Sequence, residues 1–237
     1  MSLLETLLYG KSYSVCAFCK SKVNRTDAVF SDGCVCICRE CNSKIKVAPF
    51  DFTYKGTKHI SYVISPLYYK DLIRDAILNL KFSNDNGIAE ALGYYINNYL
   101  TTFDGLFDDF DCLVPVPLSK IHYNRRGYNQ AELIARQIEK VYKIPANTEI
   151  LKKIKDTPPQ SSLSHDKRAK NAENVYAADS SVKDMRIMLV DDVFTTGSTL
   201  ESCAKELKDK GAAFTAAITV TYGTKPQHSK NYYELFP

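Results

Sequence analysis

Two adjacent carboxylates and a hydroxyl-rich loop stand out in residues 187–200. Asp191 and Asp192 end an apolar run, and Thr195, Thr196, Gly197, Ser198 and Thr199 follow, directly before a segment with helical spacing of apolar residues. A loop leading into a helix N-terminus directs several backbone N–H groups at one point, which suits a phosphate dianion. Gly197 permits the left-handed backbone that such a loop needs. The pattern predicts a site for a ribose 5-phosphate, with the carboxylates accepting hydrogen bonds from vicinal hydroxyls. The alternative is an acidic strand end whose hydroxyl residues serve only as a helix N-cap.

This segment resembles the motif of type I phosphoribosyltransferases that binds 5-phosphoribosyl 1-pyrophosphate (PRPP). In that motif, two acidic residues lie between an apolar strand and a T-T-G-x-[ST] loop. The resemblance implies that Asp191 and Asp192 orient the ribose, and that Val190 and residues 195–199 line the PRPP site.

A second group of chemically active residues consists of cysteines, six of which lie between positions 16 and 41. Cys16 and Cys19 form one C-x-x-C pair and Cys38 and Cys41 another, with 18 residues between the pairs. This spacing is typical of a structural zinc site, which we predict. A disulfide framework is the alternative, and Cys34 or Cys36 could replace one of the four ligands.

Composition limits the class of protein. The chain has 237 residues, of which 45% are hydrophobic and 24% charged, as in globular proteins. No apolar run approaches the roughly 20 residues that span a bilayer. The first residues lack the basic start of a secretory signal. We therefore expect a cytoplasmic protein without a membrane span, whose thiols stay reduced.

The net charge of +4 is unevenly distributed along the chain. Residues 1–60 hold nine Lys or Arg and five Asp or Glu, whereas the remaining residues hold equal numbers of each sign. This asymmetry indicates a nucleic-acid contact. The alternative is an ordinary solvated face. The basic residues expected to make the contact surround the cysteines: Lys20, Lys22, Arg25, Lys44 and Lys46.

Hydrophobic periodicity predicts helices over 71–82, 87–100 and 129–142 and strands over 62–69, 112–117 and 214–222. Strands that alternate with helices predict an α/β fold, a parallel sheet with helices on both faces. We expect a zinc-ribbon module in residues 1–55 and a phosphoribosyltransferase-like domain in 56–237, within which 60–105 forms a hood or insertion. In such sheets ligands bind beyond the carboxyl ends of the strands. This rule brings residues 114–120, 125–130 and 160–171 close to Asp191.

Taken together, four motifs resemble the ComF (ComFC-type) family of phosphoribosyltransferase-like proteins, over roughly residues 12–223. They are V-P-V-P-L at 114–118, R-R-G-Y-N-Q at 125–130, Q-x-x-L-x(4)-R-x-x-N at 160–171, and the four-cysteine finger. Tyr128 stands where the family usually has Phe. The family is associated with natural competence and uptake of transforming DNA. The resemblance implies PRPP bound with Mg²⁺ on backbone N–H groups of Leu118 and Ser119. It also implies that Arg125 and Arg126 clamp phosphate oxygens and that Arg168 closes over pyrophosphate.

The sequence leaves several functions open. The first is a PRPP-dependent phosphoribosyltransferase of unknown acceptor that acts in competence and handles single-stranded DNA. The others are a non-catalytic nucleic-acid-binding adaptor, a PRPP-sensing regulator and a nucleobase-salvage enzyme. The expected partners are PRPP, single-stranded DNA, and a competence helicase or DNA-processing protein.

Overall fold

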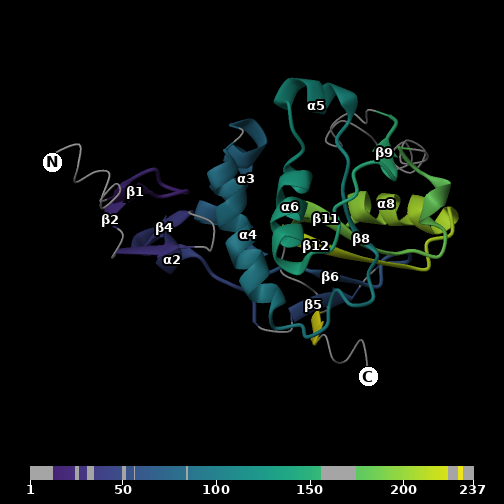
Figure 1. Ribbon diagram of the computed structural model, residues 1–237, viewed down its shortest axis with the longest axis horizontal. Coiled ribbons are helices and arrows are strands. Elements are labelled where there is room, and N and C mark those ends of the chain that lie inside the picture. The colour runs from purple at the N-terminus through teal and green to yellow at the C-terminus, as the bar shows by residue number, and fades with distance from the viewer. Residues whose placement is uncertain are drawn as a thin grey trace.

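A computed structural model describes residues 13–24, 27–30, 35–49, 52–55, 57–83, 85–155, 175–223 and 229–231. They form a small N-terminal module and a larger α/β domain, with two helices between them (Figure 1). Among the residues described, no helix has the length and apolar content needed to cross a membrane.

The N-terminal module consists of two short antiparallel strand pairs followed by one helical turn and a half. Its elements are β1 (Tyr13–Val15), β2 (Lys22–Asn24), β3 (Ala28–Phe30), β4 (Cys36–Cys38) and α2 (Arg39–Lys44). A bridge between Cys16 and Cys36 joins the two pairs. Few apolar side chains are buried here, among them Phe18, Val23 and Ile37, so the module has little core of its own.

The larger domain is built on one sheet with the strand order β13-β5-β6-β12-β11-β8. Its strands are β5 (Phe52–Lys55), β6 (Tyr62–Ile64), β7 (Leu67–Tyr68), β8 (Cys112–Pro115), β11 (Arg186–Phe194), β12 (Phe214–Tyr222) and β13 (Ser229–Asn231). The central strands β6, β12, β11 and β8 are parallel, as predicted. The edge differs from the prediction, because β5 and β13 pair antiparallel. The strand predicted over 62–69 is split, since Pro66 cannot donate to the ladder and β7 resumes the pairing with β12 at Leu67.

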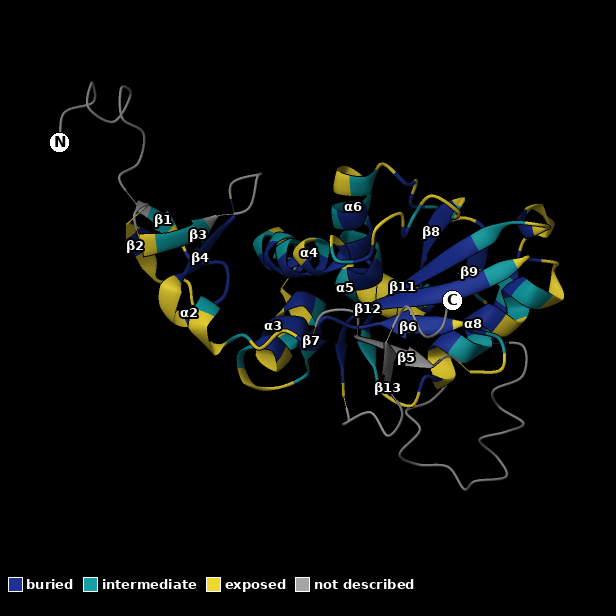
Figure 2. Cartoon of the chain, turned by 90° about the horizontal axis from the view of Figure 1, so that it is seen from below, coloured by how far each residue is buried: buried dark blue, intermediate teal, exposed yellow. Residues whose placement is uncertain are grey.

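Helices cover both faces of the sheet. They are α3 (Asp71–Phe82), α4 (Asn86–Leu100), α5 (Lys120–Arg126), α6 (Gln130–Tyr142) and α8 (Ser198–Asp209). Successive side chains of a strand point to opposite faces. Asp192 of β11 contacts Lys81 of α3, whereas the charge of Asp191 acts on Cys203 of α8. The helices α3 and α8 therefore lie on opposite faces, and the buried central strands run between them (Figure 2).

Close packing of α4 on α6 fixes the helical layer on the Asp192 face. A Cβ atom added at Gly93 of α4 would lie 2.5 Å from the Cβ atom of Gln137 of α6, so only glycine permits this approach. The remaining described elements are a hairpin of β9 (Leu151–Lys153) and β10 (Tyr176–Ala178), and a 3-10 turn at Ser180–Val182.

Tyrosines of α4 join the two modules. The Tyr95 hydroxyl donates to Asn42 Oδ1 at 2.7 Å, and the Tyr99 hydroxyl donates to the Pro49 carbonyl at 2.7 Å. These tyrosines therefore serve as packing residues between the modules. The boundary after residue 55 stays a prediction, and residues 52–55, which it assigns to the zinc-ribbon module, form β5 and pair with β6 in the main sheet.

Candidate functional site

The acidic pair lies at the carboxyl end of β11, in the middle of the parallel part of the sheet. Asp191 Oδ1 accepts a hydrogen bond of 2.8 Å from the backbone N–H of Asp192. Asp191 keeps part of its surface exposed, whereas Asp192 is buried, with 5% of its surface exposed. Asp192 is buried because α3 lies against that face of the sheet.

Lys81, near the end of α3, forms an ion pair with Asp192 Oδ2 and was not found by sequence reasoning. Its side chain is 23% exposed, compared with 7% for Asp192. The pair places a cation within the acidic end of β11 and neutralises one of the two carboxylates.

Although part of the Asp191 residue is exposed, its carboxylate is surrounded by protein, and this desolvation, followed by the neighbouring Asp192 carboxylate, raises the pKa of Asp191 well above its ordinary value. Lys81 acts in the opposite direction and lowers this pKa. Two adjacent acids at a strand end thus share the neighbourhood of one lysine, which pairs with Asp192, and this arrangement favours binding of a further cation or of hydroxyl donors.

The loop after β11 has the conformation that the sequence predicted. Gly197 has φ of +75° and is the residue that precedes the first turn of α8. A Cβ atom there would lie 2.9 Å from the Phe194 ring, so both backbone and space require glycine. The hydroxyls of Thr196 and Ser198 are 3.0 Å apart. Asp191 and the loop line a small hollow of about 20 Å³, open to solvent at the helix N-terminus.

The second predicted segment lies beside the first. Val190 of β11 pairs with Pro115 of β8, and the Val116 N–H donates to the Val190 carbonyl at 2.8 Å. Leu118 and Ser119 therefore follow β8 at the sheet edge that carries the acidic pair. Ser119 is buried, and its hydroxyl accepts from the His122 N–H at 3.3 Å as the N-cap of α5.

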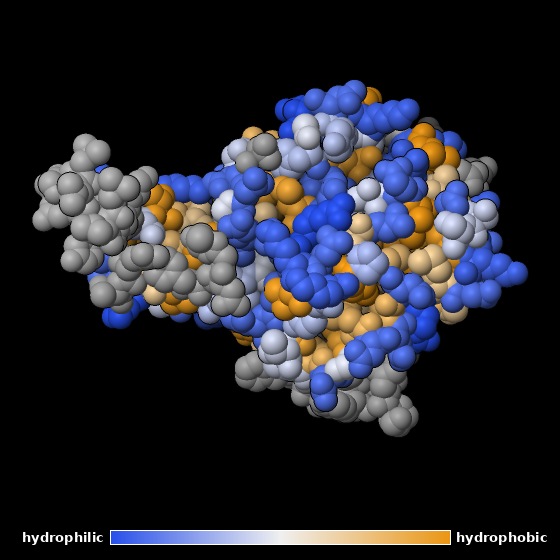
Figure 3. All heavy atoms as spheres, viewed as in Figure 1, coloured by the Kyte–Doolittle hydropathy of each residue, from blue (hydrophilic) through white to orange (hydrophobic). Residues whose placement is uncertain are grey.

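Residues 120–126 form the helix α5, and the motif at 125–130 begins in its last turn. Gly127 ends this helix with φ of +78°. The surface over α5 is mostly hydrophilic (Figure 3). Arg125 is exposed there, and Arg126 donates to Gln130 Oε1 at 2.9 Å while its guanidinium lies 5.7 Å from the centre of the Phe82 ring.

Tyr128 connects this segment to α3. Its hydroxyl donates to the Leu80 carbonyl at 2.5 Å, next to Lys81. Asn129 caps α6 by accepting from the Ala131 N–H and also donates to the Val116 carbonyl at 3.0 Å. The segment 118–128, which includes α5, is thereby fixed at both ends to the elements that hold the acidic pair.

Three residues of the predicted sites lie outside the described residues: Arg25, Cys34 and Arg168. The third motif, at 160–171, also lies outside them. The described ends of that segment, β9 and β10, pair with each other, and Lys153 lies 5.7 Å from the centre of the Tyr176 ring.

The four predicted metal ligands come together in the N-terminal module. The Sγ atoms of Cys16, Cys19, Cys38 and Cys41 all lie within 4.8 Å of one another, and those of Cys19 and Cys38 are 3.7 Å apart. A tetrahedral zinc with Zn–S bonds of about 2.3 Å needs S–S edges of about 3.8 Å, so the residues fit this ion.

Hydrogen bonds and charge also favour a metal in this cluster. Backbone N–H groups donate to the sulfur of Cys16 at 3.4 Å and of Cys38 at 3.3 Å. Burial raises the pKa of Cys38 and of Cys41, and neighbouring thiols contribute. Four thiolates this close need a dication to ionise together. Among the described residues these four are the only cysteines, histidines or acids grouped in this way, and Cys36 is not among them.

The basic residues of the N-terminal module have different surroundings. Lys20 forms an ion pair with Asp85 at the start of α4 and donates to the Ala17 carbonyl at 2.8 Å, so it joins the modules. Lys44 lies 2.6 Å from Glu40. Lys22, Lys44 and Lys46 are exposed.

The chain is similar to a known domain family and to several curated proteins. Residues 124–236 match the family model for the phosphoribosyl transferase domain. Competence protein F of Haemophilus influenzae is 39% identical over 104 residues, which cover 43% of this chain and 45% of that protein. Competence protein ComFC of Bacillus subtilis is 29% identical and covers 61% of this chain and 57% of its own length. DNA utilization protein YhgH of Escherichia coli is 31% identical, with 61% and 65% covered.

The chain thus spans between 45% and 65% of the length of these relatives. Among solved structures, a purine phosphoribosyltransferase of Pyrococcus horikoshii is 19% identical, with 59% of this chain and 75% of that chain covered and a TM-score of 0.30. The domain match and the relatives point the same way: part of the chain is similar to phosphoribosyl transferase domains, and the chain is similar to competence proteins F and ComFC.

Proposed function

We propose that this protein binds PRPP with Mg²⁺ at the end of β11 and transfers the phosphoribosyl group during the handling of incoming DNA. The observation that carries the proposal is the acidic pair Asp191–Asp192 followed by a hydroxyl-rich loop with Gly197 in the left-handed region. No other residue type serves at Gly197 without moving Phe194.

Each part of the site has a role in the reaction. Residues 195–199 bind the 5-phosphate through backbone N–H groups and hydroxyls, and Asp191 accepts hydrogen bonds from the ribose hydroxyls. Leu118 and Ser119 contribute backbone N–H groups to the pyrophosphate, and Arg125 and Arg126 supply positive charge. Arg168 is the candidate for covering the pyrophosphate.

The chemistry is a substitution at the anomeric carbon. The bond from that carbon to the pyrophosphate oxygen breaks, a bond to a nitrogen nucleophile forms, and the nitrogen loses its proton. Negative charge gathers on the departing pyrophosphate, so fixed cations and N–H groups there lower the barrier. Mg²⁺, held mostly by substrate oxygens and water with the acidic pair nearby, would neutralise part of this charge.

Calorimetry with PRPP and Mg²⁺ tests the proposal. The Asp191→Asn/Asp192→Asn variant should bind PRPP at least tenfold more weakly than the wild type. Asp108→Asn/Asp109→Asn is the matched control, because these adjacent acids are exposed and Asp109 pairs with Arg186 at the opposite end of β11. Equal PRPP affinity in the wild type and the first variant would refute the proposal.

Turnover separates the enzyme from the other functions that fit the same site. Release of pyrophosphate from PRPP, measured with a panel of nucleobases and with or without single-stranded DNA, identifies a transferase. PRPP binding without turnover under any of these conditions identifies a PRPP-sensing regulator or an adaptor instead. Turnover with a free base in the absence of DNA identifies a salvage enzyme.

We also propose that the protein binds single-stranded DNA. The exposed lysines of the zinc module favour this, and relatives carry names that refer to competence and DNA utilization. Binding to about three phosphates weakens roughly tenfold to twentyfold between 50 and 200 mM salt. Anisotropy of a labelled oligothymidylate should show this fall, and Lys22→Gln/Lys44→Gln should bind more weakly than Lys140→Gln/Lys210→Gln. Binding that is insensitive to salt, or equal in the two variants, would contradict it.

A further inference from the structure

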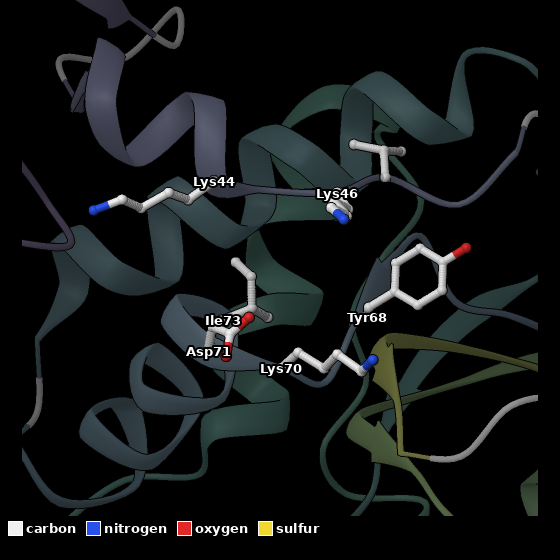
Figure 4. A pocket seen from close by; sticks show the side chains of 7 residues that line it. Lys44, Lys46, Tyr68, Lys70, Asp71 and Ile73 are labelled. Atoms are coloured by element: carbon white, nitrogen blue, oxygen red, sulfur yellow. The ribbon is translucent and has the colours of Figure 1, made fainter.

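A basic cavity lies where the N-terminal module meets the sheet. It has a volume of about 630 Å³ and is lined by residues of both modules: Lys44, Lys46, Val47, Tyr68, Lys70, Asp71 and Ile73 (Figure 4). None of these residues belongs to the acidic pair, to the loop after β11 or to the four-cysteine centre. The volume falls within the range of small-molecule sites.

Lysines provide the charge of this cavity. Lys46 and Lys70 are exposed and line the cavity, and the Lys70 side chain runs toward the Tyr68 ring, whereas Lys44 points away from it (Figure 4). The direction of Lys44 agrees with its ion pair to Glu40. Within the described part of the chain, no ion pair involves Lys46 or Lys70, so their charges are available to an anion.

The cavity wall is fixed by backbone pairing. Val47 forms a bridge with Leu67, and the Ala48 N–H donates to the Pro66 carbonyl at 2.7 Å. The Tyr68 ring lies 4.8 Å from the Tyr222 ring, centre to centre, and Tyr68 pairs with Tyr222 in the sheet. The Tyr68 ring therefore packs against Tyr222 and also lines the cavity.

An anion site alone does not explain the lining. Asp71, whose backbone has φ of +44°, adds a carboxylate beside the lysines. A carboxylate repels a compact polyanion but accepts a hydrogen bond from a hydroxyl or amino group. The set therefore suits a ligand in which a phosphate is separated from a hydrogen-bond donor by a flat ring that stacks on tyrosine. A nucleotide has these three parts, and base–aromatic stacking tolerates any base.

The sheet register relates this cavity to the PRPP site. Tyr68 pairs with Tyr222 of β12, and Tyr222 pairs with Phe194 of β11, which directly precedes the hydroxyl-rich loop. Two interstrand spacings amount to about 10 Å, so both sites lie along one edge of the sheet.

We propose that this junction cavity is a nucleotide-binding site, with the phosphate on Lys46 and Lys70, the base against Tyr68 and a ligand donor on Asp71. The nucleotide is free or is one unit of a single strand. The inference does not depend on PRPP binding.

Calorimetry with AMP, inorganic phosphate and adenosine, and anisotropy with a short oligothymidylate, test this assignment on the full chain. Lys46→Met/Lys70→Met should weaken AMP binding roughly tenfold or more, since two charge-assisted contacts are lost. Lys140→Met/Lys210→Met removes the same charge from exposed lysines elsewhere and should leave AMP binding unchanged. Tyr68→Leu should weaken AMP and not phosphate. All three variants should bind PRPP as the wild type does, which separates a failure here from a failure at the β11 site.

Comparing the AMP and oligothymidylate measurements identifies the source of the nucleotide. A loss for AMP alone in Lys46→Met/Lys70→Met indicates a free nucleotide, and a loss for both AMP and the oligothymidylate indicates a strand. Equal affinity of this variant and the wild type for both probes overturns the proposal. Phosphate binding as tight as AMP binding also overturns it, because the ring would then contribute nothing.

Discussion

Replacing Lys81 by methionine isolates the ion pair that holds Asp192. Methionine keeps most of the length and apolar surface of the lysine side chain, so the change removes mainly the charge. The Asp192 carboxylate, with 7% of its side chain exposed, would then be left in a buried position without its cation.

The burial of the two partners sets the magnitude. Removing one partner of a fully buried pair costs about 3–5 kcal/mol, and exposed pairs contribute about 1 kcal/mol or less. Lys81 has 23% of its side chain exposed, so water can partly replace the ammonium group. We expect a loss of about 2 kcal/mol in the free energy of unfolding, which for a chain of this size lowers Tm by about 4–8 °C.

A double-mutant cycle with Asp192→Asn measures the coupling. Urea unfolding of the ligand-free protein at pH 7.5 should show that Lys81→Met/Asp192→Asn is no less stable than Asp192→Asn alone, since no buried charge remains. Lys44→Met is the control, because its pair with Glu40 is exposed and should contribute much less to stability than the pair of Lys81 with Asp192. Additive losses in the double variant, or a loss for Lys81→Met no larger than the control, would show that the pair does not support the site.

Three further outcomes follow from the geometry. Purified protein should contain one zinc per chain by elemental analysis, and Cys36→Ser should retain it while Cys38→Ser loses it; zinc lost in both would mean that the ligand set is wrong. Gly197→Ala should cost more stability than Gly127→Ala in thermal unfolding, because both glycines have positive φ but only Gly197 would also meet a neighbour, Phe194; equal losses would mean that Phe194 yields freely. The raised pKa of Asp191 stabilises the fold fully only below the ordinary value of about 3.9, and this contribution is lost as pH rises through the raised pKa. Asp191→Asn should therefore be more stable than the ligand-free wild type at pH 8 and not at pH 3.5, and a variant less stable at pH 8 would contradict this sign.

Local signals predicted the parts of the fold that depend on neighbours in sequence. The helix over 71–82 and the helix after Gly197 follow from apolar spacing, and the four-cysteine cluster follows from ligand spacing. The antiparallel edge strand β5 lies in a region, 42–60, whose sequence fits either a linker or an irregular strand pair, because four residues carry too little periodicity to identify a strand. The helix α5 had a usable signal that was not applied, namely Ser119 as N-cap and Gly127 as C-terminal glycine.

Contacts between distant segments account for what the sequence could not supply. Nothing in the pattern around Lys81 marks it as a partner of Asp192, since it sits beside the apolar face of its helix like many solvated lysines. The same holds for Lys20, which we assigned to nucleic acid and which pairs with Asp85. Charge counts along a sequence show where cations are and not which of them already have a partner.

The alternating direction of side chains along β11 makes the two acids of the pair chemically different. Because Asp191 and Asp192 are adjacent in a strand, their side chains face opposite layers, and only one of them meets Lys81. Asp192 is buried and paired with Lys81, whereas Asp191 carries the raised pKa and remains partly exposed beside the loop. The two acids are therefore not equivalent. A ligand with cationic character or hydroxyl donors therefore gains most from Asp191. The charged form of Asp191 destabilises the ligand-free fold, and a bound ligand compensates for this charge. At this position the protein loses folding stability and gains ligand affinity.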